Sequence, residues 1–177
     1  MESRRKRKRS QITKWVCYAL LMLLCTVLQT LPGLFQLGEA KPLWLLPLAL
    51  AVAVEEGEFA GGIFGAVCGL MWDYTAGRTA GMLAFELLLL CFLLSAVMQL
   101  YFKTSAANVV LLETAAVLLV LSLDWLFFYY MPGYSWALSR WLTFVLPSAM
   151  MTLVPSLVLF SLVRHIYSAF KIDNGVV

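Results

Sequence analysis

Side chains that could do acid–base, metal or nucleophilic chemistry are few in this sequence and lie far apart. The single histidine, His165, stands beside Arg164 near the end of the last apolar run. Neither a metal cluster nor a Ser-His pair can be assembled around one histidine in that position. The chain also has neither an HExxH nor a GxSxG motif. We therefore expect a protein with no enzyme activity, no metal ion and no cofactor.

Three carboxylates, Glu86, Glu113 and Asp124, lie inside long apolar runs. Ionisable groups within membrane spans are rare and usually face a bundle interior or water. Glu113 and Asp124 are eleven residues apart, which puts them on one helix face but about 16 Å apart along its axis. They are too far apart to act as a carboxylate pair. Snorkelling to an interface and an internal hydrogen bond both explain such residues, and no continuous chain of them marks a proton or cation path.

The four cysteines do not form a reactive or structural set. Each lies inside an apolar run and no CxxC pair is present; the positions are Cys17, Cys25, Cys68 and Cys91. Cysteines in this setting are typical of small buried apolar side chains, so we expect neither disulfides nor metal ligation.

The composition decides which class of protein must position these residues. Hydrophobic residues make up 62% of the 177-residue chain and charged residues 13%, against about 45–50% and about 25% in an ordinary soluble domain. A soluble protein could not cover its surface with so few charges. The composition therefore excludes a water-soluble globular enzyme, a disordered chain and a disulfide-rich mini-domain, and it indicates a polytopic membrane protein.

We predict an all-α, polytopic membrane bundle of six transmembrane helices. Four apolar runs are long enough to cross a hydrocarbon core of about 30 Å. Two shorter runs, 43–54 and 59–72, form either two thin spans or a re-entrant hairpin. The predicted division is a basic cytoplasmic tail (1–14), a six-helix transmembrane domain (15–163) and a cytoplasmic C-terminal tail (164–177). The four long runs cover residues 15–37, 82–102, 106–130 and 138–163.

The distribution of Lys and Arg predicts the orientation. Seven of the 13 cations fall in the first fourteen residues. With the N-terminus inside, ten cations lie on inner segments and three on outer ones, so the positive-inside rule predicts that both termini are cytoplasmic. Because the N-terminal cluster adjoins a long apolar run, we expect it to contact anionic lipid headgroups and not nucleic acid. The cluster consists of Arg4, Arg5, Lys6, Arg7, Lys8 and Arg9.

The most informative pattern is a ladder of glycines at a spacing of four residues. On a helix, positions four apart form one ridge, so the glycines predict a smooth groove along one face. Small residues let membrane helices approach closely. The groove packs against another helix of the same chain or receives a helix of a partner, and the two interpretations are compatible. The ladder is Gly57, Gly61, Gly65, Gly69, Asp73, Gly77 and Gly81.

The last three members of the ladder predict a turn at the outer face. Asp73, Gly77 and Gly81 surround a short polar stretch that also contains Arg78. A carboxylate at the membrane boundary is either hydrated or paired with Arg78 across the turn. We therefore interpret Asp73 as a residue that fixes the turn, not as a proton carrier.

The order of these segments resembles the family of the rod shape-determining protein MreD. The resemblance covers most of the chain by hydropathy and residues 42–90 by motif. Its features are a basic N-terminus, a first span that ends near Pro32 and a Pro-led short run (42–54). The glycine ladder from Gly57 then closes on Asp73, and residues 82–85 (Met-Leu-Ala-Phe) lead into the next helix.

The resemblance implies a non-enzymatic subunit of the bacterial cell-elongation machinery, in the plasma membrane, that regulates cell shape and lateral peptidoglycan synthesis. The implied partners are the single-span protein MreC, the actin-like MreB, the RodA glycosyltransferase and its penicillin-binding transpeptidase. The family also implies a six-helix fold similar to the S-components of energy-coupling-factor vitamin transporters, so the alternative is a solute-binding S-component. Such proteins meet their transporter through an AxxxA face on the first helix, but here Ala19 is followed four residues later by Leu23. We therefore prefer the interpretation as an assembly subunit.

Overall fold

The computed structural model shows a bundle of helices without a strand in the residues that it describes. Six continuous helical segments are present there, because η1 directly continues α5, and η2 joins α6 to α7. This confirms the predicted all-α helix bundle. The described residues are 2–31, 33, 36, 38–77, 81–101 and 106–170. The elements are α1 (Glu2–Thr30), α2 (Leu45–Glu56), α3 (Glu58–Ala76), α4 (Met82–Tyr101), α5 (Ala106–Trp125), η1 (Leu126–Tyr130), α6 (Ala137–Arg140), η2 (Trp141–Val145) and α7 (Leu146–Phe170).

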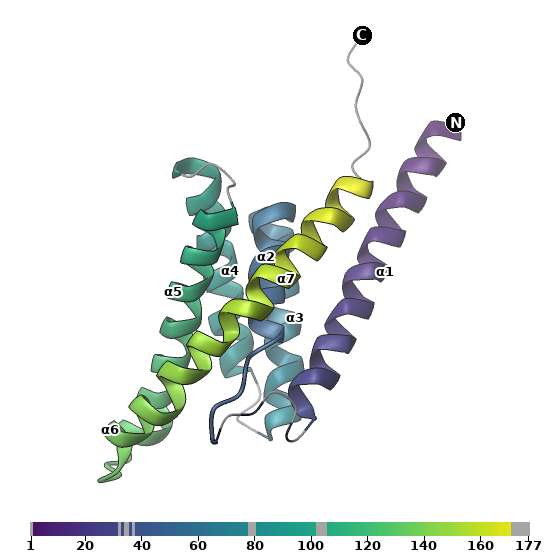
Figure 1. Ribbon diagram of the computed structural model, residues 1–177. Helices are drawn as coiled ribbons and strands as arrows, with labels where there is room; N and C mark the ends of the chain where they lie inside the picture. The colour runs from purple at the N-terminus through teal and green to yellow at the C-terminus, as the bar shows by residue number, and fades with distance from the viewer. Residues whose placement is uncertain are drawn as a thin grey trace.

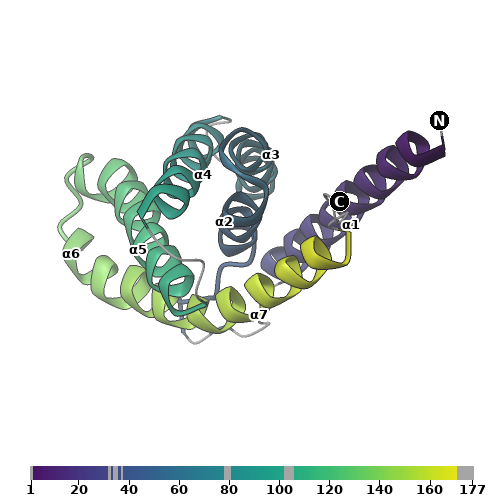
Figure 2. The same ribbon diagram turned by 90° about the horizontal axis from the view of Figure 1, so that it is seen from above.

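The start of α1 and the end of α7 lie at the same end of the bundle (Figure 1). There the hydroxyl of Ser10 donates to the carbonyl of Phe170, at 3.5 Å. We call this the terminal end, and we call the opposite end, where α1 stops and α6 begins, the distal end. Viewed along the bundle, α2 lies between α3 and α7 (Figure 2). In the same view α4 lies between α3 and α5.

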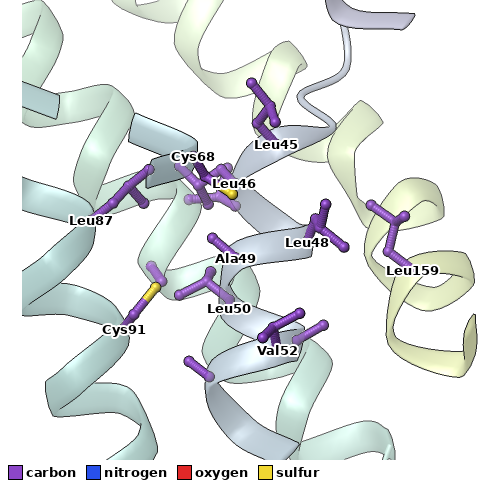
Figure 3. Close-up of a cluster of buried hydrophobic side chains, with 14 of the residues drawn as sticks. Leu45, Leu46, Leu48, Ala49, Leu50, Val52, Cys68, Leu87, Cys91 and Leu159 are labelled. Atoms are coloured by element: carbon purple, nitrogen blue, oxygen red, sulfur yellow. The ribbon is translucent and has the colours of Figure 1, made fainter. Parts of the chain in front are cut away.

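Helix α2 is the core of the bundle. Each of its residues from Leu45 to Ala53 is buried. Figure 3 shows Leu87 and Cys91 of α4 and Leu159 of α7 around it. A helix that is apolar on every side is stable when other helices surround it. The run 43–54, predicted as a thin span or half of a hairpin, is therefore enclosed by its own chain.

Neighbouring helices hold the N-terminus of α2 in place. The first N–H groups of a helix have no intrahelical acceptor. Here the N–H groups of Trp44 and Leu45 both donate to Oε1 of Gln29 on α1, at 3.1 Å each. The N–H of Leu43 donates to Oγ1 of Thr152 on α7, also at 3.1 Å. Side chains from two other helices thus replace a local cap.

Four helices are long and apolar enough to cross a membrane within the described residues, judged by length and composition. Helices α2 and α3 are not among them. At about 1.5 Å per residue, the 12 residues of α2 reach about 18 Å. The spans are Arg9–Thr30, Met82–Leu100, Asn108–Tyr130 and Ala137–Phe170.

The helix bounds differ from the predicted runs at several ends. Helix α1 already begins at Glu2, within the predicted basic tail, and α3 continues to Ala76, beyond the predicted end at residue 72. Helix α1 stops at Thr30, seven residues before the predicted end at residue 37. Helix α7 continues to Phe170, beyond the predicted end at residue 163, because no Gly or Pro follows Pro155 in that stretch. The first part of the predicted C-terminal tail is therefore helical, and residues 171–177 lie outside the described residues.

Candidate functional site

Three glycines of α3 form a seam against α2 and α4, and we call Gly61, Gly65 and Gly69 the glycine seam. All three are buried. A Cβ added to Gly65 would lie 2.6 Å from Sγ of Cys91 and 2.9 Å from the carbonyl oxygen of Leu87. These distances leave no room for any side chain. The seam therefore brings helices of this chain into backbone contact.

The other two seam positions are equally tight. A Cβ on Gly69 would lie 2.5 Å from Cα of Ala84 and 2.7 Å from its nitrogen. A Cβ on Gly61 would overlap the backbone of Ala53 on α2. The neighbouring Gly62 differs, since a Cβ there would stand 3.5 Å from its nearest atom, a carbonyl oxygen of Leu88. Close approach is thus a property of one face of α3 and not of every glycine on it.

The remaining ladder residues shape the ends of α3. Gly57 connects α2 to α3 with φ +93°, and Gly77 ends α3 in the left-handed region with φ +63°. Residues with a Cβ rarely adopt these conformations. Gly81 also has a positive φ. The glycines of the ladder therefore have two different roles. Gly61, Gly65 and Gly69 allow close packing, whereas Gly57, Gly77 and Gly81 allow turns.

Asp73 is buried and fastens α3 to the start of α4. Its Oδ2 accepts hydrogen bonds from the N–H of Gly81, at 2.9 Å, and from the N–H of Leu83, at 3.2 Å. A carboxylate at a helix N-terminus satisfies free N–H groups and interacts favourably with the helix dipole. Asp73 thus caps α4 from eight residues away. Arg78, which the sequence analysis named as a possible ion-pair partner of Asp73, lies outside the described residues.

An ion pair that the sequence did not reveal joins α1 to the α2–α3 turn. Nζ of Lys14 lies 2.6 Å from Oε2 of Glu56, and the hydroxyl of Tyr18 donates to Oε1 at 2.8 Å. The side chains of the two charged residues are only 7% and 9% exposed. The ammonium also lies 5.3 Å from the ring centroid of Tyr167 on α7. Lys14 therefore ties three helices together near the terminal end.

The predicted headgroup cluster lies in the first turns of α1. The side chain of Arg9 is exposed. Lys14, which belongs to the same run of cations by sequence, is instead buried against Glu56. One signal in the sequence could have distinguished Lys14 from the headgroup cluster. Tyr18 follows Lys14 by one helical turn, so both side chains face the same neighbouring helix.

The three acids inside the long helices have different surroundings. Glu113 is fully buried, and although Ser156 is a polar neighbour, neither carboxylate oxygen makes a hydrogen bond of standard geometry with a residue that the structure describes. Asp124 lines a pocket of about 360 Å³ at the distal end, with Lys41 and Trp72. Glu86 lines an apolar groove between α4 and α5. The acids are thus distributed over three separate places.

Residues suited to metal chemistry do not converge in the described part of the chain. No group of three or more His, Cys, Asp or Glu side chains that could hold a metal ion is found there. The single histidine is exposed near the end of α7. Cys25, Cys68 and Cys91 are buried, Cys17 is partly buried, and all four are free thiols. The arrangement offers tight helix contacts and apolar surfaces, which are means of assembly.

These features define an integral membrane protein whose short central helix is enclosed by long apolar ones. The chain matches the family model of the rod shape-determining protein MreD over residues 9–170. It therefore belongs to the MreD family and is a rod shape-determining membrane protein. No curated protein and no solved structure gives a significant match.

Proposed function

We propose that the chain is a non-enzymatic integral membrane subunit of the bacterial cell-elongation complex. In this role it regulates cell shape and lateral peptidoglycan synthesis by helix–helix assembly with other membrane proteins. The observation that carries the proposal is the family match, which spans all of the helices from Arg9 to Phe170. The glycine seam and the apolar grooves support it, since close helix packing and apolar surfaces are means of assembly.

The proposed partners are a single-span MreC-like protein, MreB, RodA and the penicillin-binding transpeptidase. The family belongs to the shape-determining system that includes the first two of these. Helices meet in a bilayer by van der Waals packing and interhelical polar contacts. The glycine seam lies between helices of this chain, so we infer that it builds the scaffold and that a partner binds at another surface.

We further propose that the terminal end faces the cytoplasm of a bacterial plasma membrane. The cations Arg4 to Arg9 lie at this end, where anionic headgroups attract basic residues. Arg164 lies in the last turns of α7 at the same end. The basic segment would then hold the cytoplasmic face of the bundle against the membrane surface.

The proposed function is tested by depletion in a rod-shaped bacterium that carries this gene. We expect depleted cells to become round and a plasmid copy of the wild-type chain to restore rods, as seen by microscopy. An inactive control is a copy that lacks residues 45–77, because this removes the core helix and the seam. Rod-shaped growth after depletion, or a vitamin requirement without rounding, would contradict the proposal.

The orientation gives a separate prediction. Ser135 is exposed between η1 and α6 at the distal end, and Ala169 is exposed near the end of α7. In intact spheroplasts we expect a membrane-impermeant maleimide to label Ser135→Cys, and to label Ala169→Cys only after lysis. The parent for both is a variant whose four native cysteines are replaced by alanine. Labelling in the opposite order would reverse the proposed orientation.

A further inference from the structure

A pocket of about 360 Å³ lies at the distal end, between the end of α1 and the start of α2, and we call it the distal pocket. Its volume is that of roughly twelve water molecules in the liquid. This is room for a polar head group but not for long acyl chains. Its lining combines charged, polar and apolar side chains. The residues that matter here are Gln29, Lys41, Leu43, Trp72, Asp124 and Phe144.

Gln29 brings a hydrogen-bond donor to the distal pocket. Its Oε1 accepts from the N–H groups of Trp44 and Leu45, so the orientation of the amide is fixed. The Nε2 group of the same amide makes no hydrogen bond with a residue that the structure describes. Gln29 is only 8% exposed and lines the pocket. Its Nε2 is therefore a buried donor that a ligand in the pocket can use.

Lys41 adds a positive charge on the same side of the distal pocket. It lies two residues before Leu43, in the connection that leads into α2. Within the described part of the chain it has no ion-pair partner. The dipole of α2, which begins at Leu45, is positive at this end. A ligand with a negatively charged acceptor therefore fits this side of the pocket.

The distal pocket lies at the depth of lipid head groups. Thr30 lines it, and the first apolar span ends at this residue. The polar head groups of a bilayer begin where the hydrocarbon core ends, so their phosphates lie at this depth. Trp72 and Phe144 supply aromatic surface in the pocket, and aromatic rings are enriched at membrane interfaces. They can contact the carbon atoms next to a lipid phosphate.

We propose that the distal pocket binds a phosphate ester through Lys41 and Nε2 of Gln29, and that a lipid head group of the adjacent leaflet supplies it. This goes beyond the proposed function, since it requires no protein partner. Asp124 lines the pocket from α5 and already interacts within the chain. A carboxylate repels an anion, so Asp124 confines the phosphate to the side of Lys41 and Gln29.

The test uses photo-cross-linking of the full chain in neutral maltoside micelles. Benzoylphenylalanine replaces Phe144 in the distal pocket or, as a control, Ile63 in the apolar groove between α1 and α3. The two added lipids are dioleoyl phosphatidylglycerol and dioleoylglycerol, which has the same acyl chains but no phosphate. We expect the probe at Phe144 to capture the phospholipid about tenfold better. The probe at Ile63 should capture both lipids equally, because it contacts acyl chains only.

Two variants test the donors. We expect Lys41→Gln and Gln29→Glu each to lower the capture of phosphatidylglycerol at Phe144 about tenfold, through the loss of one charge-assisted hydrogen bond. Gln29→Glu keeps an acceptor for the N–H groups of Trp44 and Leu45, so it removes the donor without uncapping α2. Each variant must elute as a single symmetric peak. Since Lys41 is exposed, Lys41→Gln provides the test if Gln29→Glu does not fold.

Two further variants separate specific binding from general attraction of anionic lipid. Asp124→Asn should raise the capture of phosphatidylglycerol, because it removes a negative charge from the pocket. Arg164→Gln removes an exposed cation at the terminal end and should leave the capture unchanged. Lower capture with Asp124→Asn, or equal losses with Arg164→Gln and Lys41→Gln, would overturn the proposal.

Three other results would also overturn it. They are equal capture of the two lipids at Phe144, unchanged capture with folded Lys41→Gln, and full displacement of the lipid by glycerol 3-phosphate at equal concentration. The last of these would assign the phosphate site to a soluble ester and not to a lipid. All of these measurements use the isolated chain, so a failure of the proposed function in cells would leave them unaffected.

Discussion

Replacing Gly69 with alanine should destabilise the bundle severely, even though it adds a single methyl group. The new Cβ would lie 2.5 Å from Cα of Ala84 and 2.7 Å from its nitrogen, so the conflict is with backbone atoms that no rotamer change can move. Overpacking typically costs about 1–3 kcal/mol, and we expect the upper end of this range. A loss of about 3 kcal/mol lowers Tm by roughly 6–12 °C in a chain of this size.

Gly62→Ala is the matched control for this prediction. Both glycines are buried on α3, but a Cβ on Gly62 would stay 3.5 Å from its nearest atom, which is ordinary contact. We expect Gly62→Ala to keep the wild-type Tm in detergent, while Gly69→Leu and Gly65→Leu do not give a folded protein. Equal Tm values for Gly62→Ala and Gly69→Ala would show that the seam does not limit stability.

The second large effect is expected from Lys14→Met. This change leaves Glu56 buried without its cation, with one hydrogen bond from Tyr18. Breaking a buried ion pair by removing one partner costs about 3–5 kcal/mol, mostly because an uncompensated charge remains. We therefore expect a clear fall in Tm. The double variant Lys14→Met/Glu56→Gln should recover most of it, because no buried charge remains and the amide oxygen of the new side chain can still accept from Tyr18.

A control on the same turn of α1 is Thr13→Met. Thr13 is exposed, and its hydroxyl donates to the carbonyl of Arg9 within the same helix. This variant should keep the wild-type Tm. If the double variant were no more stable than Lys14→Met, the loss would come from the packing of the lysine side chain over Tyr167 and not from charge.

The sequence predicted the features that depend on local pattern. Hydropathy and length identified the long helices, and the spacing of the glycines identified α3 as the helix that approaches its neighbours closely. The special role of Asp73 at a turn was also visible, since it is the one acid in a ladder of glycines. Each of these follows from a pattern within one continuous stretch of the sequence, a helix or the turn that ends it.

Features that depend on distant parts of the chain were missed. Lys14 was grouped with the N-terminal cations because its partner, Glu56, comes 42 residues later. The central place of α2 was missed for a related reason, since an apolar run of 12 residues has the same pattern as a thin span or as an enclosed helix. A thin span and an enclosed helix differ only in which helices surround the run. The composition of the run does not contain that information.

The contact between α3 and α4 forms because Gly65 and Gly69 have no side chains, and this limits which mutations the contact can tolerate. Every substitution at Gly65 or Gly69 adds side-chain atoms, so every substitution at these positions increases the overlap with α4. Shrinking the opposite wall offers little relief: Cys91→Ala would remove one conflict at Gly65, but the carbonyl of Leu87 would remain, and at Gly69 the obstacle is the main chain of Ala84. Second-site suppressors of Gly69 variants should therefore be far rarer than suppressors of variants at a side-chain contact.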